Sequence, residues 1–144
     1  MVKIELVRRL AAPPQPLWDL FTDHAAWSQW AGYREAWLVR EGEPEKNGRG
    51  AIRGMVAPNG AEIQEEIVEF EPPRRVTYTM IQSPLPIKDH LTEVLLEPDG
   101  DGTRLVWRCR FKSRIPGLGW IFRLMMTPVF KDLIARLEKA ATAK

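Results

Sequence analysis

The strand expected over residues 103–112 constrains the fold most. In the sequence TRLVWRCRFK, apolar residues alternate with basic ones, and only Val106 breaks the order. Because side chains two positions apart share a face of a β-strand, one face of this strand is apolar and the other is charged. An apolar pattern with helical spacing follows over residues 118–141. The sequence therefore predicts a sheet with one apolar face, covered by one long C-terminal helix.

The rest of the chain predicts further strands and two short helices. Val2–Leu10 alternates as a first strand. Pro16 suits the first turn of a helix, and Asp23 can cap a second short helix over 24–30. Short turns rich in Gly, Pro and Asn separate the later segments, which favours antiparallel pairing. These later strands are expected over 36–41, 50–57, 61–70, 74–82 and 88–97.

Pro128 interrupts the predicted terminal helix. Because proline removes one helical hydrogen bond, a kink or break is expected near 125–127. Before it, the segment from Trp120 to Met126 is apolar nearly all round, which predicts burial on both sides or contact with another molecule. After it, an apolar stripe is expected to face the sheet. The stripe consists of Phe130, Leu133, Ile134 and Leu137.

The composition limits what the chain can bind. Its 144 residues predict a single domain over 1–144, and 21 basic against 19 acidic residues leave a net charge of +2. This small charge does not predict binding to nucleic acid. The single Cys109 lies on the apolar face as a buried thiol, which is typical of a reducing compartment. No signal-peptide pattern opens the sequence, so we expect a cytoplasmic protein.

Three segments resemble motifs of one superfamily in their order and spacing. They are AAPPQPLWDLFTDHAAWSQW (11–30), EEIVEFEPPRRVTYTM (65–80) and EPDGDGTRLVWRCRF (97–111). Nearly end to end, the chain resembles the START, polyketide-cyclase and pollen-allergen superfamily, SRPBCC. The resemblance implies the α+β helix-grip fold, in which a curved antiparallel sheet of about seven strands grips the terminal helix around a cavity. Two short helices lie between its first and second strands.

The resemblance also implies a range of functions. Members bind lipids, sterols, polyketides or plant hormones, and some cyclise or dehydrate polyketides. No metal or nucleophile signature accompanies the superfamily as a whole, and no metal or cofactor is expected. Fold membership does not decide among these roles.

Strand parity predicts which side chains face the cavity. On the strand over 88–97, the acidic residues Asp89, Glu93 and Glu97 share the outer side, which turns His90 inward. The same reasoning turns Tyr78 inward on its strand. The predicted ligand-binding residues are Arg53, Met55, Glu65, Tyr78, Met80, His90, Val94, Trp107 and Phe111 on the sheet, with Phe130, Leu133, Ile134 and Leu137 on the helix.

The polar members of this set have several possible roles. A buried Glu65 needs a partner, and Arg53 across the Asn59-Gly60 turn is the nearest. This pair can be structural, orient a ligand or take part in acid–base chemistry. The imidazole of His90 can be a satisfied wall residue, a donor to a ligand or a catalytic base. Glu65, Tyr78 and His90 are therefore the catalytic candidates, and the sequence selects none of them.

The histidine and four of the tryptophans outside the predicted ligand-binding set are expected to have structural roles. His24 lies in the connection between the two short helices and is expected to be exposed. It has no metal-ligand spacing to the other histidine, so no metal site is predicted. Four tryptophans are expected in the core or in a lid over it. They are Trp18, Trp27, Trp30 and Trp37.

The sequence favours binding of a small hydrophobic molecule, such as a lipid or polyketide, for transport, sequestration or sensing. The alternative is an enzyme of the polyketide cyclase or dehydratase kind that uses the same cavity. A second alternative is docking to a partner or to a membrane surface through Trp120 to Met126, which we favour less. The cavity entrance is expected between the loop over 83–87 and the helix start near Leu118. The oligomeric state stays open.

Overall fold

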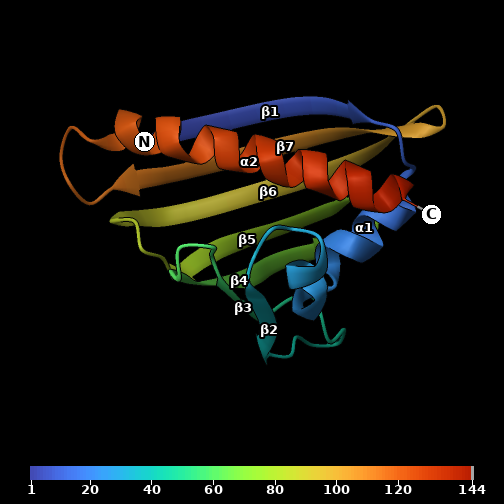
Figure 1. Cartoon of the computed structure of the whole chain (residues 1–144), viewed down its shortest axis with the longest axis horizontal. Helices are drawn as coiled ribbons and strands as arrows, with labels where there is room; N and C mark the ends of the chain where they lie inside the picture. Colours follow the sequence, from blue (N-terminus) through green and yellow to red (C-terminus); the bar gives the residue numbers. More distant parts are fainter. Residues whose placement is uncertain (144) are drawn as a thin grey trace.

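The computed structural model describes residues 1–143. In that range the chain forms one seven-stranded sheet, two α-helices and one 3-10 helix (Figure 1). The helical elements are α1 (Pro14–Thr22), η1 (His24–Gln29) and α2 (Gly119–Thr142). The strands are β1 (Val2–Leu10), β2 (Glu35–Arg40), β3 (Ile52–Val56), β4 (Glu62–Glu71), β5 (Arg75–Gln82), β6 (Ile87–Asp99) and β7 (Gly102–Ser113).

All neighbouring strands of the sheet run antiparallel. Their order is β1-β7-β6-β5-β4-β3-β2, so the first strand pairs with the last and the others follow as a meander. Figure 1 shows α2 lying along the β1, β7 and β6 side of the sheet, while the sheet curves away through β5 and β4 towards β2. The helices α1 and η1 lie between the first two strands in sequence. This is the helix-grip α+β fold that the resemblance implied.

Period-two patterning identified the inner face of the sheet correctly. On β7, Leu105, Trp107 and Phe111 are completely buried, while the basic residues between them are exposed. Cys109 lies on the same inner face, where burial raises the pKa of its thiol to about 11. Such a thiol stays protonated at neutral pH, as expected for a structural cysteine.

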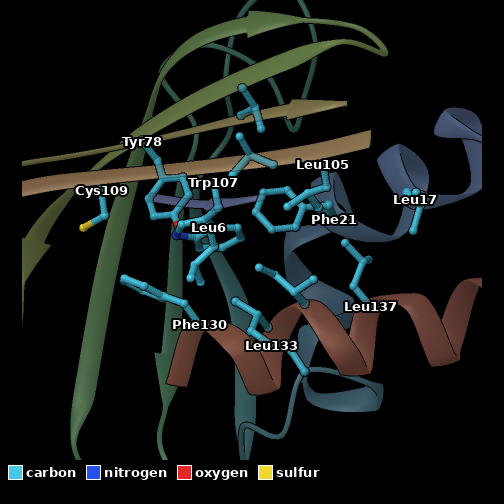
Figure 2. Packing of buried hydrophobic residues seen from close by; sticks show 14 of the residues in the cluster. Leu6, Leu17, Phe21, Tyr78, Leu105, Trp107, Cys109, Phe130, Leu133 and Leu137 are labelled. Carbon is cyan, nitrogen blue, oxygen red and sulfur yellow. The ribbon is translucent and has the colours of Figure 1, made fainter. Parts of the chain in front are cut away.

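One half of the space between sheet and helix is filled by side chains. Figure 2 shows Phe130, Leu133 and Leu137 pointing from α2 towards the sheet and α1. The ring centroids of Trp107 and Phe130 are 5.2 Å apart, and Phe21 of α1 packs edge-on against Trp107 at 5.8 Å. These contacts fill this part of the space between α2 and the sheet. This half is a solid core.

Of the kink or break predicted near 125–127, the break does not occur. Helix α2 continues through this residue from Gly119 to Thr142. Pro128 is exposed, so the carbonyl that loses its helical partner lies on the side of the helix that faces water. Thr127 adds a local hydrogen bond, because its hydroxyl donates to the carbonyl of Arg123 at 2.7 Å. The helix therefore tolerates the proline without ending.

The tryptophans divide between core and surface. Trp18 and Trp27 are buried and Trp30 is half-buried, as predicted. Trp37 differs, because it is 38% exposed on the outer face of β2. Its indole lies over Gly54 of β3, where a Cβ atom would come within 2.6 Å of the ring. The missing side chain at Gly54 makes room for Trp37 outside the core.

Candidate functional site

A cavity of about 530 Å³ lies between the middle of α2 and strands β4 and β5. This volume is within the range of about 300–1,000 Å³ that is usual for small-molecule sites. Its inner wall is mainly apolar and includes Trp27, Ala31, Ile63, Leu85 and Met126. Its rim contains exposed residues of α2 and of two loops. These rim residues are Pro58, Pro84, Met125, Pro128, Val129, Asp132 and Arg136.

The structure brings five of the predicted ligand-binding residues to this cavity. They are Glu65, Tyr78, Met80, Phe130 and Leu133. The other predicted residues are buried but lie outside the lining, in the packed core or behind the cavity wall. This second group consists of Arg53, Met55, His90, Val94, Trp107, Phe111, Ile134 and Leu137.

The mouth of the cavity is formed where the sequence has no periodicity. Gly32 and Tyr33 come from the segment after η1, and Ser83 comes from the loop between β5 and β6. The loop over 83–87 was predicted at the entrance, but Leu118 is not part of the lining, and the middle of α2 takes its place. Ile63 of β4 also lines the cavity and was not among the predicted ligand-binding residues.

Arg53 and Glu65 form a buried ion pair beside the cavity. The two residues face each other on β3 and β4, as predicted for partners across the Asn59-Gly60 turn. The Nε of Arg53 donates to Oε1 of Glu65 at 2.8 Å, and the side chains are 0% and 7% exposed. Glu65 lines the cavity, and its second oxygen, Oε2, can accept from a bound molecule.

Aromatic rings surround the Arg53 guanidinium. Its central carbon lies 3.8 Å from the ring centroid of Trp27 and 4.6 Å from that of Tyr78. Such cation–π contacts are strongest where water is excluded. Nη2 of Arg53 is buried with no hydrogen-bond partner among the described residues. The guanidinium is thus held by Glu65 on one edge and by two rings on its faces.

His24 is part of this arrangement and is completely buried, so the predicted exposure is wrong. Nε2 of His24 is 2.8 Å from the carbonyl oxygen of Asn47, which fixes the proton on Nε2. The other nitrogen, Nδ1, can then accept from Nη1 of Arg53 at 3.4 Å. Burial, and next the positive charge of Arg53, lowers the pKa of His24 to about 3. A neutral imidazole therefore supports the arginine from behind.

Two tyrosine hydroxyls complete the polar part of the cavity. Tyr33 and Tyr78 both line it. Burial, and next the negative charge of Glu65, raises the pKa of each above the usual value for tyrosine. Both hydroxyls therefore stay protonated at neutral pH and can donate a hydrogen bond. The cavity offers two neutral donors and one carboxylate within a largely apolar wall.

His90 points inward as predicted but holds the sheet together. Its Nδ1 accepts from the backbone N–H of Met80 at 3.0 Å, and its Nε2 is 2.9 Å from Oγ1 of Thr92. Burial lowers its pKa to about 4. Because both ring nitrogens are engaged, the imidazole has no free position for a substrate proton. The geometry makes His90 a satisfied wall histidine.

A second hollow of about 510 Å³ lies on the outer face of the sheet. Its walls carry charged side chains that already pair with one another. Arg75 bonds Glu69, Glu71 and Glu93 at 2.7 Å each, and Arg108 bonds Glu93 at 3.2 Å. The hydrogen bond from Arg75 lowers the pKa of Glu93. This ion-pair network braces neighbouring strands, and the cavity under α2 is the candidate site.

Comparison with known proteins identifies the family. A family model described as polyketide cyclase / dehydrase and lipid transport matches residues 1–142. The chain belongs to this family. The match covers every helix and strand described above, and it confirms the resemblance seen in the three sequence motifs. No curated protein matches this sequence.

Solved structures share the fold at low sequence identity. A protein from Thermobifida fusca is 24% identical with a TM-score of 0.80, covering 98% of this chain and 93% of that one. XoxI from Bacillus cereus is 18% identical with a TM-score of 0.78, covering 97% and 95%. Norcoclaurine synthase from Thalictrum flavum, in complex with dopamine and hydroxybenzaldehyde, is 13% identical with a TM-score of 0.75, covering 96% and 84%. These likenesses show the fold alone.

Residues 1–143 show neither a metal-ligand cluster nor a membrane-spanning helix. No group of three or more His, Cys, Asp or Glu side chains in this range could hold a metal ion. No helix in the same range is long and apolar enough to cross a bilayer.

Proposed function

We propose that this polyketide cyclase/lipid-transport family member binds a small, mostly apolar molecule in the cavity under α2, for transport, sequestration or sensing. The observation that carries the proposal is the cavity itself: one half of the helix–sheet space is packed solid, and the other half is hollow and lined mainly by apolar side chains. Each 100 Å² of apolar ligand surface buried there contributes roughly 2.5 kcal/mol before the entropic cost of binding.

The polar groups of the cavity select one end of the ligand. Oε2 of Glu65 accepts hydrogen bonds, and the hydroxyls of Tyr33 and Tyr78 donate them. A hydroxyl or amine of the ligand can donate a hydrogen bond to Glu65. The oxygen of a ligand hydroxyl can also accept a hydrogen bond from a tyrosine. The cavity thus suits an apolar body with one hydroxylated or amino end. A carboxylate at that end would face Glu65 and be repelled.

Native mass spectrometry of gently purified protein, followed by organic extraction, tests this proposal. We expect a discrete extra mass that belongs to an apolar molecule with a hydroxyl or amine. The variant Ile63→Trp, which fills the cavity from β4, should lack this mass. Val68→Trp is the matched control, because Val68 is exposed on the same strand. An extra mass that remains in Ile63→Trp would locate binding outside the cavity.

A second candidate function is catalysis of the polyketide cyclase or dehydratase kind. The observation that favours it is the shared cavity of Glu65, Tyr33 and Tyr78, where a carboxylate and neutral hydroxyls could move protons on a folded substrate. Turnover of a poly-β-ketone should then fall sharply in Tyr78→Phe or Glu65→Gln. Turnover that survives both changes together with His90→Ala would contradict this assignment.

A further inference from the structure

The outward face of the first half of α2 is apolar. Trp120, Leu124, Met125 and Val129 are 62%, 65%, 50% and 55% exposed, and we call these four residues the α2 patch. Trp120 and Leu124 lie on the side of the helix away from its buried stripe, and Met125 and Val129 lie on its flank. Large apolar side chains gathered on one exposed face are typical of an interaction surface. The segment that the sequence marked as apolar all round therefore has one face in the core and one face free.

The α2 patch is continuous with the rim of the cavity. Met125 and Val129 are half-exposed members of the patch, and both also line the cavity. A molecule that enters or leaves through this part of the rim therefore passes directly beside the patch.

The surroundings of the α2 patch are basic. The chain contains no Asp or Glu between Asp101 and Asp132. Arg123 and Lys131 flank the patch on α2, both are exposed, and neither forms an ion pair within residues 1–143. Asp132, the nearest acidic residue along the helix, is paired with Arg136 at 2.7 Å. An exposed apolar face bordered by free basic residues is typical of helices that lie on anionic lipid surfaces.

We propose that the α2 patch docks onto a bilayer surface that contains anionic lipids. The apolar side chains of the patch lie in the interface, and Arg123 and Lys131 contact lipid phosphates. Helix α2 lies along the membrane plane and does not cross it. Docking places the cavity rim against the lipid, so an apolar molecule can enter without passing through water. The docking itself does not depend on the identity of the cavity's ligand.

Charge favours a lipid surface over a second copy of the chain. In a two-fold dimer the same patch of both copies would meet, and so would the residues around it. Arg123 and Lys131 of both copies would then surround one interface, and Asp132, the nearest acidic residue along α2, is already paired with Arg136. An anionic bilayer supplies the missing negative charge.

Flotation with lipid vesicles tests the proposal on the full-length protein. We expect it to float with vesicles of phosphatidylcholine and phosphatidylglycerol, and much less with phosphatidylcholine alone. Leu124→Glu should abolish flotation while circular dichroism stays unchanged, because Leu124 does not contribute to the core. Val39→Glu is the matched control, because Val39 is exposed on β2. The Val39→Glu protein should float as the unmutated protein does. Removing Arg123 or Lys131 should weaken binding by about fivefold each.

Tryptophan fluorescence gives a second, local readout. Trp120 should move from water into the interface, so a blue shift is expected on anionic vesicles and should disappear in Trp120→Phe. Absence of flotation, or equal flotation of Leu124→Glu, would overturn the proposal. A dimer in light scattering that Leu124→Glu converts to a monomer, with no vesicle binding, would overturn it too, because the patch would then be a self-interface. Binding to vesicles can be absent while the cavity still binds its ligand, so the two proposals fail separately.

Discussion

At the scale of single residues, the Arg53–Glu65 pair decides the character of the site. A buried guanidinium and a buried carboxylate are each unfavourable alone, and together they neutralise each other at 2.8 Å. His24 and the rings of Trp27 and Tyr78 occupy the remaining sides of Arg53. The pair therefore fixes one carboxylate oxygen at the cavity wall in a defined position.

Breaking this pair from one side should be costly. Glu65→Leu leaves the Arg53 guanidinium buried without its counter-charge, and we expect a loss of about 3–5 kcal/mol in the free energy of unfolding. The double variant Arg53→Met with Glu65→Leu removes both charges and should recover most of that loss. Urea denaturation of the single and double variants measures the difference. Equal stability of the single and double variants would show that the pair is not coupled.

The two buried histidines should make stability depend on pH. The folded protein keeps His24 and His90 neutral, with pKa values of about 3 and about 4, whereas the unfolded chain protonates them near pH 6.5. The stability that these neutral histidines allow is thus fully present above pH 6.5, and it is lost as the pH falls towards 4 because the unfolded chain gains protons that the folded protein does not. At pH 5 the loss is about 2 kcal/mol for each histidine.

Substitution of His90 separates the pH dependence caused by the histidines from that caused by the carboxylates. The pKa values of Glu69 and Glu93 are lowered by their hydrogen bonds to Arg75, so both stay mostly ionised above pH 5. Unfolding measured between pH 7 and pH 5 should therefore show a shallower slope in His90→Asn. A slope unchanged by that substitution would contradict the burial of a neutral imidazole at position 90.

At the scale of elements, the β5–β6 pair is held together by a side chain. The regular ladder between these strands ends at Tyr78 and Thr92, and the register of β6 against β7 shifts between Lys88 and Leu91. Beyond that point the imidazole of His90 accepts from the backbone N–H of Met80. A side chain thus takes the place of a carbonyl in the sheet, next to the wall of the cavity.

Hydrogen exchange can test whether the imidazole of His90 accepts the Met80 hydrogen bond in place of a backbone carbonyl. We expect the Met80 amide to be protected in the unmutated protein and to exchange much faster in His90→Ala. His90→Asn should restore part of the protection, because the amide oxygen of asparagine can accept near the position of Nδ1. Equal protection of Met80 in His90→Ala would mean that another group closes the gap.

Sequence periodicity predicted the elements well and the site only in part. Alternation is a property of each strand, so the inward faces of β6 and β7 followed from parity, and the Asn59-Gly60 turn placed Arg53 opposite Glu65. The cavity depends instead on how far α2 stands from each strand, which no local pattern records. His24 begins the short helix η1 and Tyr33 lies in the segment after it, where no periodicity marks them, and tertiary packing alone brings them to the site.

At the scale of the whole molecule, the fold divides the space under α2 into a packed half and a hollow half. The packed half, around Trp107 and Phe21, supplies rigidity. The hollow half opens between α2, the segment after η1 and the loop between β5 and β6. A ligand can therefore be enclosed without opening the core, and the apolar outer face of α2 lies beside the opening.

Titration with the neutral fluorescent amine N-phenyl-1-naphthylamine tests the central claim, that this hollow binds small apolar molecules. The account predicts saturable binding to one site in the unmutated protein and in Val68→Trp, and its loss in Ile63→Trp. Ile63→Trp should also unfold at a similar or higher temperature, because the added ring fills empty space, whereas overpacking a solid core costs about 1–3 kcal/mol. Absence of saturable binding to the unmutated protein, or equal binding by Ile63→Trp, would contradict the claim.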